Sequence, residues 1–155
     1  MEMIVFFKEL FDYVFTQNQR IIQQLRDQPD KASERSQLLL SHIVNAHHIW
    51  NAKIIQSTPL MKPWDLHSLE KVDSMDRENL ENTRAILSEM ELDQEVPYRL
   101  RGRKTFHHPV GDLLFQVVNH TAYHRGQIAT EFRKCGMEPI MSEYIVHKMT
   151  GNKKK

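Results

Sequence analysis

The spacing of apolar residues constrains the fold of this chain more than any other feature of its sequence. Within residues 3–27 these side chains recur every three or four positions, the period of a helix with one buried face: Phe7, Phe11, Val14, Ile22 and Leu25. The period returns in three further segments, at about 34–57, 75–90 and 109–134. Because such faces are buried only by packing together, the sequence predicts an all-α four-helix bundle.

Capping and helix-breaking residues set the expected bounds of these helices. Pro29 ends the first, since proline cannot continue a helix. Ser33 and Ser74 are predicted to cap the second and third, and Gly136 follows the end of the fourth. A short last helix is expected at 142–149.

The connector between the third and fourth helices differs from the other loops. Residues 96–106, VPYRLRGRKTF, alternate apolar and polar positions around Gly102, a pattern typical of a hairpin or an extended linker. The length of 155 residues predicts a single domain over 1–150, and the basic segment 151–155 is expected to be a disordered tail.

Composition narrows the class of protein. The net charge of +1 gives no general attraction to nucleic acid, and no apolar stretch reaches the length of a membrane span, so neither partner is expected. Cys135 is the only cysteine, which excludes a disulfide within the chain and favours a cytoplasmic protein.

Two histidines on the predicted fourth helix are candidate metal ligands. His120 and His124 lie four positions apart, so both imidazoles project from one face of the helix. Val117 and Ile128 fall on the same stripe, which turns the pair toward the core. A shared metal ion would satisfy both buried rings. The spacing alone is equally compatible with two histidines that bind no metal.

A stable site needs a third ligand, and His42 on the predicted second helix is the best aligned. It precedes Ile49 and Trp50 by seven and eight positions, which places it near their side of the helix. His47 and His48 point roughly 140° and 240° away from it. The other histidines are expected to be exposed, in loops or on a terminal turn: His67, His107, His108 and His147.

The sequence lacks the motifs of two other kinds of metal site, that of the zinc proteases and that of the di-iron bundle proteins. Zinc proteases with paired histidines carry glutamate directly after the first, where this chain has Thr121. Di-iron bundles use Glu-x-x-His, which occurs nowhere in the sequence. A mononuclear site of three imidazoles, with positions open to water or substrate, remains. Arg125 and Gln127 are candidates for contacts around the ligands, or else solvent-facing residues.

The segment NHTAYHRGQIATEFRKCG, at 119–136, resembles the hallmark of DinB-like (damage-inducible) proteins, in which a histidine, three residues and HRGQ precede a glycine. The second helix agrees, because HIVNAHHIW places a tryptophan eight residues after its first histidine. The resemblance covers about 3–149 and implies a homodimeric bundle that holds a divalent metal, most often nickel or zinc. By matching positions, the implied ligands are His42, His120 and His124.

The resemblance also implies a reaction. Characterised relatives include thiol S-transferases that use bacillithiol or mycothiol, so the expected substrates are a low-molecular-weight thiol and an electrophilic small molecule. Tyr123 and Arg125 are candidates to orient an anionic substrate. Where relatives often carry an acidic residue, this chain has His47, which places an unassigned imidazole near the expected site.

Two alternatives stay open. The chain is either an enzyme of this kind or a metal-stabilised dimeric stress protein without turnover, and a metal-dependent hydrolase is a further possibility. A sealed site, or a fourth ligand from His47, would favour the non-enzymatic protein. A ligand position that opens into a pocket would favour the enzyme.

Overall fold

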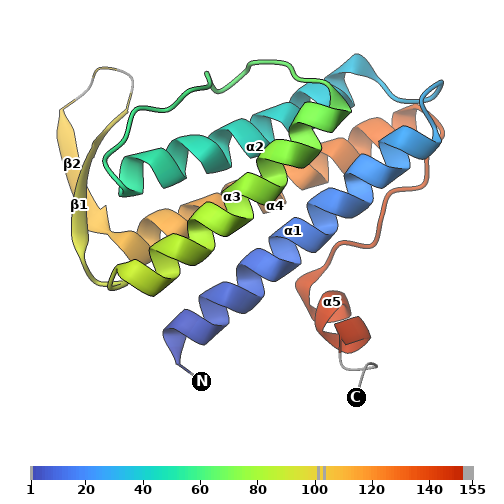
Figure 1. Cartoon of the computed structure of the whole chain (residues 1–155). Helices are drawn as coiled ribbons and strands as arrows, with labels where there is room; N and C mark the ends of the chain where they lie inside the picture. Colours follow the sequence, from blue (N-terminus) through green and yellow to red (C-terminus); the bar gives the residue numbers. More distant parts are fainter. Residues whose placement is uncertain (1, 101, 103, 152–155) are drawn as a thin grey trace.

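The structure is a computed structural model that describes residues 2–100, 102 and 104–151. Four long helices form the bundle, a hairpin covers one end of it and a short helix follows (Figure 1). In chain order the elements are α1 (Met3–Asp27), α2 (Glu34–Ile54), α3 (Leu69–Glu89), β1 (Glu95–Arg99), β2 (Thr105–Pro109), α4 (Val110–Lys134) and α5 (Tyr144–Gly151). The predicted all-α bundle with a hairpin-like connector is confirmed.

The long connection between α2 and α3 decides the topology. It crosses back over the length of the bundle, so α2 and α3 run in the same direction and α1 and α4 run in the opposite one (Figure 1). α2 packs against both α3 and α4, and α1 packs mainly against α3. The central position of α2 allows its side chains to contact side chains from two other helices.

One of the two predicted N-terminal caps is found in the structure, and the other is not. The Ser33 side chain caps α2 by accepting a hydrogen bond from the Ser36 backbone N–H. The predicted start of α3 at Ser74 is wrong, because the side chain of Ser68 caps this helix and accepts from the Lys71 N–H. The extra turn buries Val72 in the core, which stabilises the earlier start. Residues 152–155 of the predicted tail lie outside the described residues.

The hairpin closes the end of the bundle at which α4 begins. β1 and β2 pair antiparallel, with Val96 opposite His108. Val96 is buried against the helices, whereas His107 and His108 are exposed on β2. Both histidines therefore have the exposure expected of them, but they lie in a strand rather than in a loop. Gly102, at the turn, has a φ of +71° that favours glycine.

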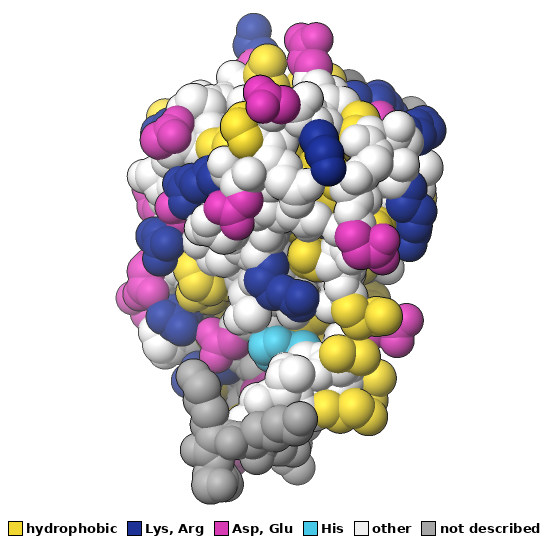
Figure 2. Space-filling view, turned by 90° about the vertical axis from the view of Figure 1, so that its right-hand side faces the viewer, with side chains coloured by type: hydrophobic (Ala, Val, Ile, Leu, Met, Phe, Trp, Pro, Cys, Tyr) yellow, Lys and Arg dark blue, Asp and Glu magenta, His cyan; other side chains and the backbone are white. Residues whose placement is uncertain are grey.

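The surface agrees with the small net charge. Figure 2 shows acidic and basic side chains interspersed over the face that it presents, without a field of one sign. None of the helices in the described residues is long and apolar enough to cross a membrane.

Two apolar clusters fill the interior, and a buried polar layer separates them. One cluster, near the hairpin, includes Phe11 and Leu114, and the other, toward the opposite end, includes Ile22 and Phe132. Each long helix contributes buried polar side chains between these clusters: Gln17 and Asn18 from α1, Asn45, His47 and Asn51 from α2, Asp76, Asn79 and Thr83 from α3, and Thr121, His124 and Arg125 from α4.

Hydrogen bonds within this polar layer join α2 to α3. His47 Nε2 lies 2.8 Å from Thr83 Oγ1, and Asn51 Nδ2 donates to the same oxygen at 3.1 Å. Asn79 Nδ2 donates to the Val44 carbonyl oxygen at 3.0 Å. Since a buried polar group without a partner is costly, these bonds fix the register of the two helices.

We predict that His47 makes the protein sensitive to acid. Complete burial, with a smaller effect of His48, lowers the pKa of His47 to about 3. The unfolded chain takes up a proton near pH 6.5, about the ordinary histidine pKa, so stability is lost as the pH falls below that value toward 3. Between pH 7 and pH 5 this group should reduce the free energy of unfolding by about 2 kcal/mol.

Urea unfolding of the wild type and of His47→Gln, at both pH values and with chelator present, measures this effect. The glutamine does not titrate, so the variant should lose about 2 kcal/mol less stability on acidification. His107→Gln removes an exposed histidine and should behave like the wild type. An equal pH dependence for the wild type and His47→Gln would show that His47 is not buried as a neutral ring.

Candidate metal centre

Three histidines from two neighbouring helices converge between α2 and α4. His42 lies on α2, and His120 and His124 lie one turn apart on α4. One ring nitrogen from each lies within 4.8 Å of the others, and the Nε2 atoms of His42 and His120 are 3.1 Å apart. Metal–imidazole bonds of about 2.1 Å place two ligand nitrogens at most about 4.2 Å apart. Small side-chain rotations therefore suffice to hold one ion.

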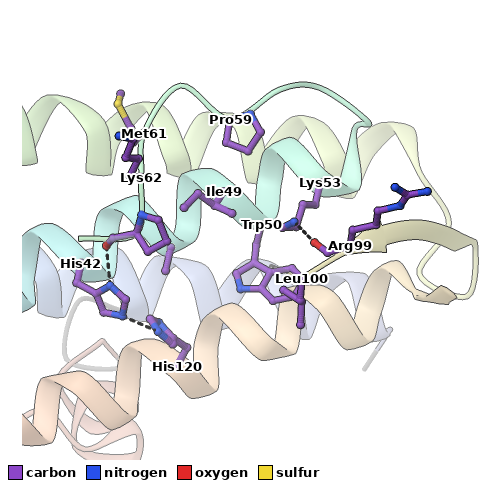
Figure 3. Close-up of a pocket in the computed structure, with 12 residues that line it drawn as sticks. His42, Ile49, Trp50, Lys53, Pro59, Met61, Lys62, Arg99, Leu100 and His120 are labelled. Atoms are coloured by element: carbon purple, nitrogen blue, oxygen red, sulfur yellow. Dashed lines mark hydrogen bonds between the residues drawn. The ribbon is translucent and has the colours of Figure 1, made fainter. Parts of the chain in front are cut away.

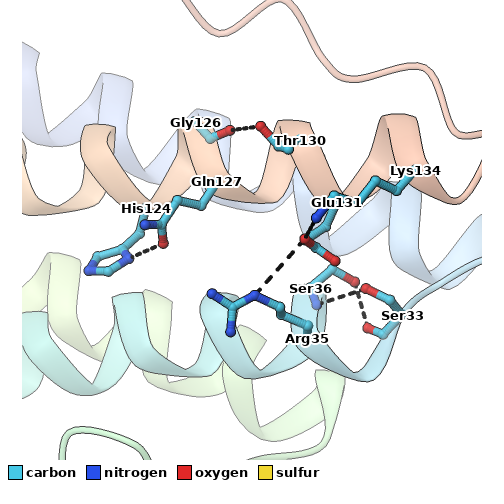
Figure 4. A network of polar contacts seen from close by, with 9 residues as sticks. All are labelled: Ser33, Arg35, Ser36, His124, Gly126, Gln127, Thr130, Glu131 and Lys134. Atoms are coloured by element: carbon cyan, nitrogen blue, oxygen red, sulfur yellow. Dashed lines mark hydrogen bonds and ion pairs between the residues drawn. The ribbon is translucent and has the colours of Figure 1, made fainter.

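Hydrogen bonds fix which nitrogen each ring presents. The Pro63 carbonyl oxygen lies 2.7 Å from His42 Nδ1, and an oxygen of that kind only accepts, so Nδ1 carries the proton. In the same way His124 Nδ1 donates to Gln127 Oε1 at 2.8 Å (Figure 4). In both rings the hydrogen bond occupies Nδ1 and leaves Nε2 as the atom that can bind a metal, as is usual for metal-binding histidines.

Burial keeps two of the three rings, His42 and His120, neutral. Burial, and then the proximity of His124 and His42, lowers the pKa of His120 to about 4. Burial also lowers the pKa of His42, against the opposing effect of its bond to Pro63. A neutral imidazole is the form that binds a metal. The donor set, its protonation and its orientation thus fit a divalent transition ion.

Trp64, in the connection between α2 and α3, covers one side of the cluster. Its ring stacks on His42 with a centroid separation of 3.7 Å and an interplanar angle of 5°, and it meets His124 edge-on. Asn45 holds the surrounding loop by donating to the Asp65 carbonyl oxygen at 2.8 Å. Our sequence analysis missed Trp64, because loop residues carry no periodicity that would place them over a helix.

A cavity of about 450 Å³ opens beside the cluster, with His42 and His120 in its wall (Figure 3). Its apolar surface comes from α2, from the loop after it and from β1: Ala46, Ile49, Trp50, Pro59, Met61, Pro63 and the adjoining Leu100. The volume is sufficient for a small molecule. Among the described residues, no further histidine, cysteine or carboxylate joins the three-histidine group.

The four residues proposed to surround the ligands divide into two pairs. Gln127 orients His124, and the exposed Tyr123 ring lies edge-on to His124 at 5.0 Å. His47 instead bonds Thr83 and packs on Phe11, away from the cluster, so the structure supplies no fourth ligand from it.

Arg125 is likewise directed away from the cluster. Its guanidinium lies over the Tyr13 ring and donates to the Tyr13 hydroxyl, which in turn donates to the Ser142 carbonyl oxygen. The arginine therefore fastens the segment before α5 to the bundle. This position does not fit the suggested contact with a substrate at the metal.

The remaining histidines are engaged elsewhere. His48 Nε2 accepts from the Leu60 N–H, and His67 bonds the Asn45 side chain. His147 lies half-buried against Tyr13 on α5, the terminal turn on which a surface residue is expected. Selection of His42 as the third member of the cluster is therefore consistent with the structure.

A second contact joins α2 to α4 farther along the bundle. Glu131 on α4 lies between Lys134, at 2.8 Å, and Arg35 on α2, at 3.9 Å (Figure 4). Arg35 and Lys134 are exposed, so these pairs contribute little to stability.

The architecture and the cluster define a class: helical-bundle proteins with a three-histidine site between two helices. The DinB family model matches residues 3–154, nearly the whole chain, and the chain belongs to the DinB family. A comparison with curated proteins gives no match.

We predict that Gln127 strengthens metal binding by orienting His124. Replacement by leucine removes the acceptor for Nδ1–H, frees the ring to rotate and should weaken the affinity for zinc or nickel by about 10- to 100-fold. Gln127→Glu keeps an acceptor oxygen and should retain most of the affinity. Gln23→Leu, at an exposed position on α1, is the matched control. Competition with a chromophoric chelator measures each dissociation constant, and equal values for Gln127→Leu and the wild type would contradict the assigned role.

Proposed function

We propose that this protein is a metal-dependent thiol S-transferase that acts on electrophilic small molecules. The observation that carries the proposal is the cavity of about 450 Å³ that opens directly onto His42 and His120. A metal that serves only to join helices needs no such opening, whereas a catalytic site keeps a position available to its substrate.

The residues around the cavity would have separate roles in binding the ion and in orienting its ligands. His42, His120 and His124 would bind the ion, with Pro63 and Gln127 holding two of the rings in place. A divalent ion bound there supplies a Lewis acid that lowers the pKa of a thiol and so provides a nucleophile at neutral pH. Nickel and zinc both suit three imidazoles.

The apolar wall would receive the body of the substrates. Ile49, Trp50 and Leu100 line it, and Trp64 shields His42 from the side. Exclusion of water there strengthens the interactions of a developing thiolate with its surroundings. The thiol sulfur would form a bond to the electrophilic carbon while the leaving group departs with the electron pair of the bond that breaks.

The non-enzymatic alternative predicts a different site. A metal that only stabilises a stress protein would be enclosed or would have a fourth protein ligand, and His47, the residue suggested for that role, bonds Thr83 instead. A hydrolase of the zinc-protease type is also disfavoured, because Thr121 occupies the position of the general base and its side chain is buried.

Replacement of two ligands tests the proposed activity. His120→Ala/His124→Ala should lose bound metal and reduce transfer of cysteine or bacillithiol to chlorodinitrobenzene by at least about 100-fold, since nucleophile activation depends on the ion. The matched control, His107→Ala/His108→Ala, removes two exposed histidines of β2 and should retain metal and activity. Measurements are metal content and the rate of chloride displacement. Full activity in the metal-free double variant would overturn the proposal.

A further inference from the structure

The cavity beside the histidines has a cationic end. The wall of the cavity includes three cations besides the apolar residues: Lys53 from α2, Lys62 from the following loop and Arg99 from β1. No aspartate or glutamate appears among the described residues of its wall. Figure 3 shows the Lys53 amine next to the Arg99 backbone at the end beside the hairpin, away from the histidines, whereas Lys62 lies above His42. The end of the cavity away from the histidines thus carries two cations, Lys53 and Arg99, and no metal ligand.

These cations lack anionic partners within the protein. In the described part of the chain no carboxylate forms an ion pair with any of the three. Lys53 Nζ donates to the Arg99 carbonyl oxygen at 2.6 Å, and Arg99 Nε donates to Thr105 Oγ1 at 3.0 Å. Both acceptors are uncharged, so the positive charges are left uncompensated.

Partial burial makes one of these charges costly. Lys53 is half-buried, and burial lowers its pKa below the ordinary lysine value. A bound anion would offset this desolvation, because opposite charges attract more strongly where water is partly excluded. The neighbouring apolar wall would exclude water from the rest of the ligand.

The helix sets the length of such a ligand. Lys53 follows His42 by eleven residues on α2, close to three full turns, so the two side chains share a face. The rise over this interval is about 16 Å. A molecule that reaches both ends therefore needs an extended body between them.

We propose that Lys53 and Arg99 form an anion subsite, and that the thiol substrate is an extended molecule with a carboxylate, sulfonate or phosphate group far from its sulfur. Its apolar part lies along Ile49, Trp50 and Leu100, and its thiol reaches the histidine end. The assignment to the thiol rests on the proposed function, whereas the anion subsite itself does not.

Binding to metal-free protein tests the subsite without the reaction. Both tryptophans of the chain, Trp50 and Trp64, lie at the cavity or at the histidines, so their fluorescence reports occupancy. At pH 8, octanoate should bind about tenfold more tightly than octanol, which has the same chain without the charge. Lys53→Gln/Arg99→Gln should remove that preference.

Control variants separate the subsite from the overall charge. Lys8→Gln/Arg133→Gln removes two exposed cations elsewhere and should retain the preference for octanoate. Lys53→Glu/Arg99→Glu should reverse it, so that octylammonium binds more tightly than octanoate. Equal affinity of the wild type for octanoate and octanol, or an unchanged preference in Lys53→Gln/Arg99→Gln, would overturn the proposal.

Thiols of matched length test the second half of the proposal. With cobalt-loaded protein, the thiolate-to-metal absorption band should titrate at about tenfold lower concentration for mercaptooctanoate than for mercaptooctanol, and this advantage should vanish in Lys53→Gln/Arg99→Gln. Equal titration of the two thiols would overturn the assignment to the thiol. If neither thiol produced a band while octanoate still bound selectively, the proposed function would fail and the anion subsite would stand.

Discussion

The imidazole of His42 is restrained on three sides, and the site depends on that restraint. The Pro63 carbonyl oxygen holds Nδ1, Trp64 stacks on the ring, and His120 faces Nε2. The loop that supplies Pro63 and Trp64 is also the connection that returns along the bundle, so that α2 and α3 run in the same direction (Figure 1). The topology of the bundle and the orientation of a ligand are therefore set by the same segment. A shift of this loop would change both the coordination geometry and the adjoining cavity.

The three histidines of the cluster lie in or beside the polar layer that crosses the interior between two apolar clusters. On its α2–α3 side the layer is held by hydrogen bonds among the side chains of His47, Asn51 and Thr83. The polar groups in this part therefore find their partners within the protein. On its α2–α4 side the three imidazoles offer lone pairs that a shared cation would satisfy. One layer thus combines a region that fixes helix register with a region suited to bind an ion. This division explains why two histidines only five positions apart on α2, His42 and His47, have unrelated roles.

The sequence predicted the parts of the protein that follow from periodicity and spacing. The four helices, the hairpin and the alignment of His42 with Trp50 all derive from regular repeats. The start of α3 was misplaced because Ser68 and Ser74 are both acceptable caps, and only burial of Val72 selects between them. Trp64 and the cationic end of the cavity depend on how a loop and a strand return to α2, which local patterns do not encode. The contact between Arg125 and Tyr13 also could not be predicted from local patterns, since the two residues lie 112 positions apart.

X-ray absorption spectroscopy of the zinc- or nickel-loaded protein, before and after addition of a thiol, tests the central claim most directly. The account predicts three imidazole ligands at about 2.0–2.1 Å, and a sulfur scatterer at about 2.3 Å for zinc when the thiol is present. The three-imidazole signal should be lost in His120→Ala/His124→Ala. Four protein ligands with no change on addition of thiol would contradict the account, because the metal would then be closed to the substrates that the cavity admits.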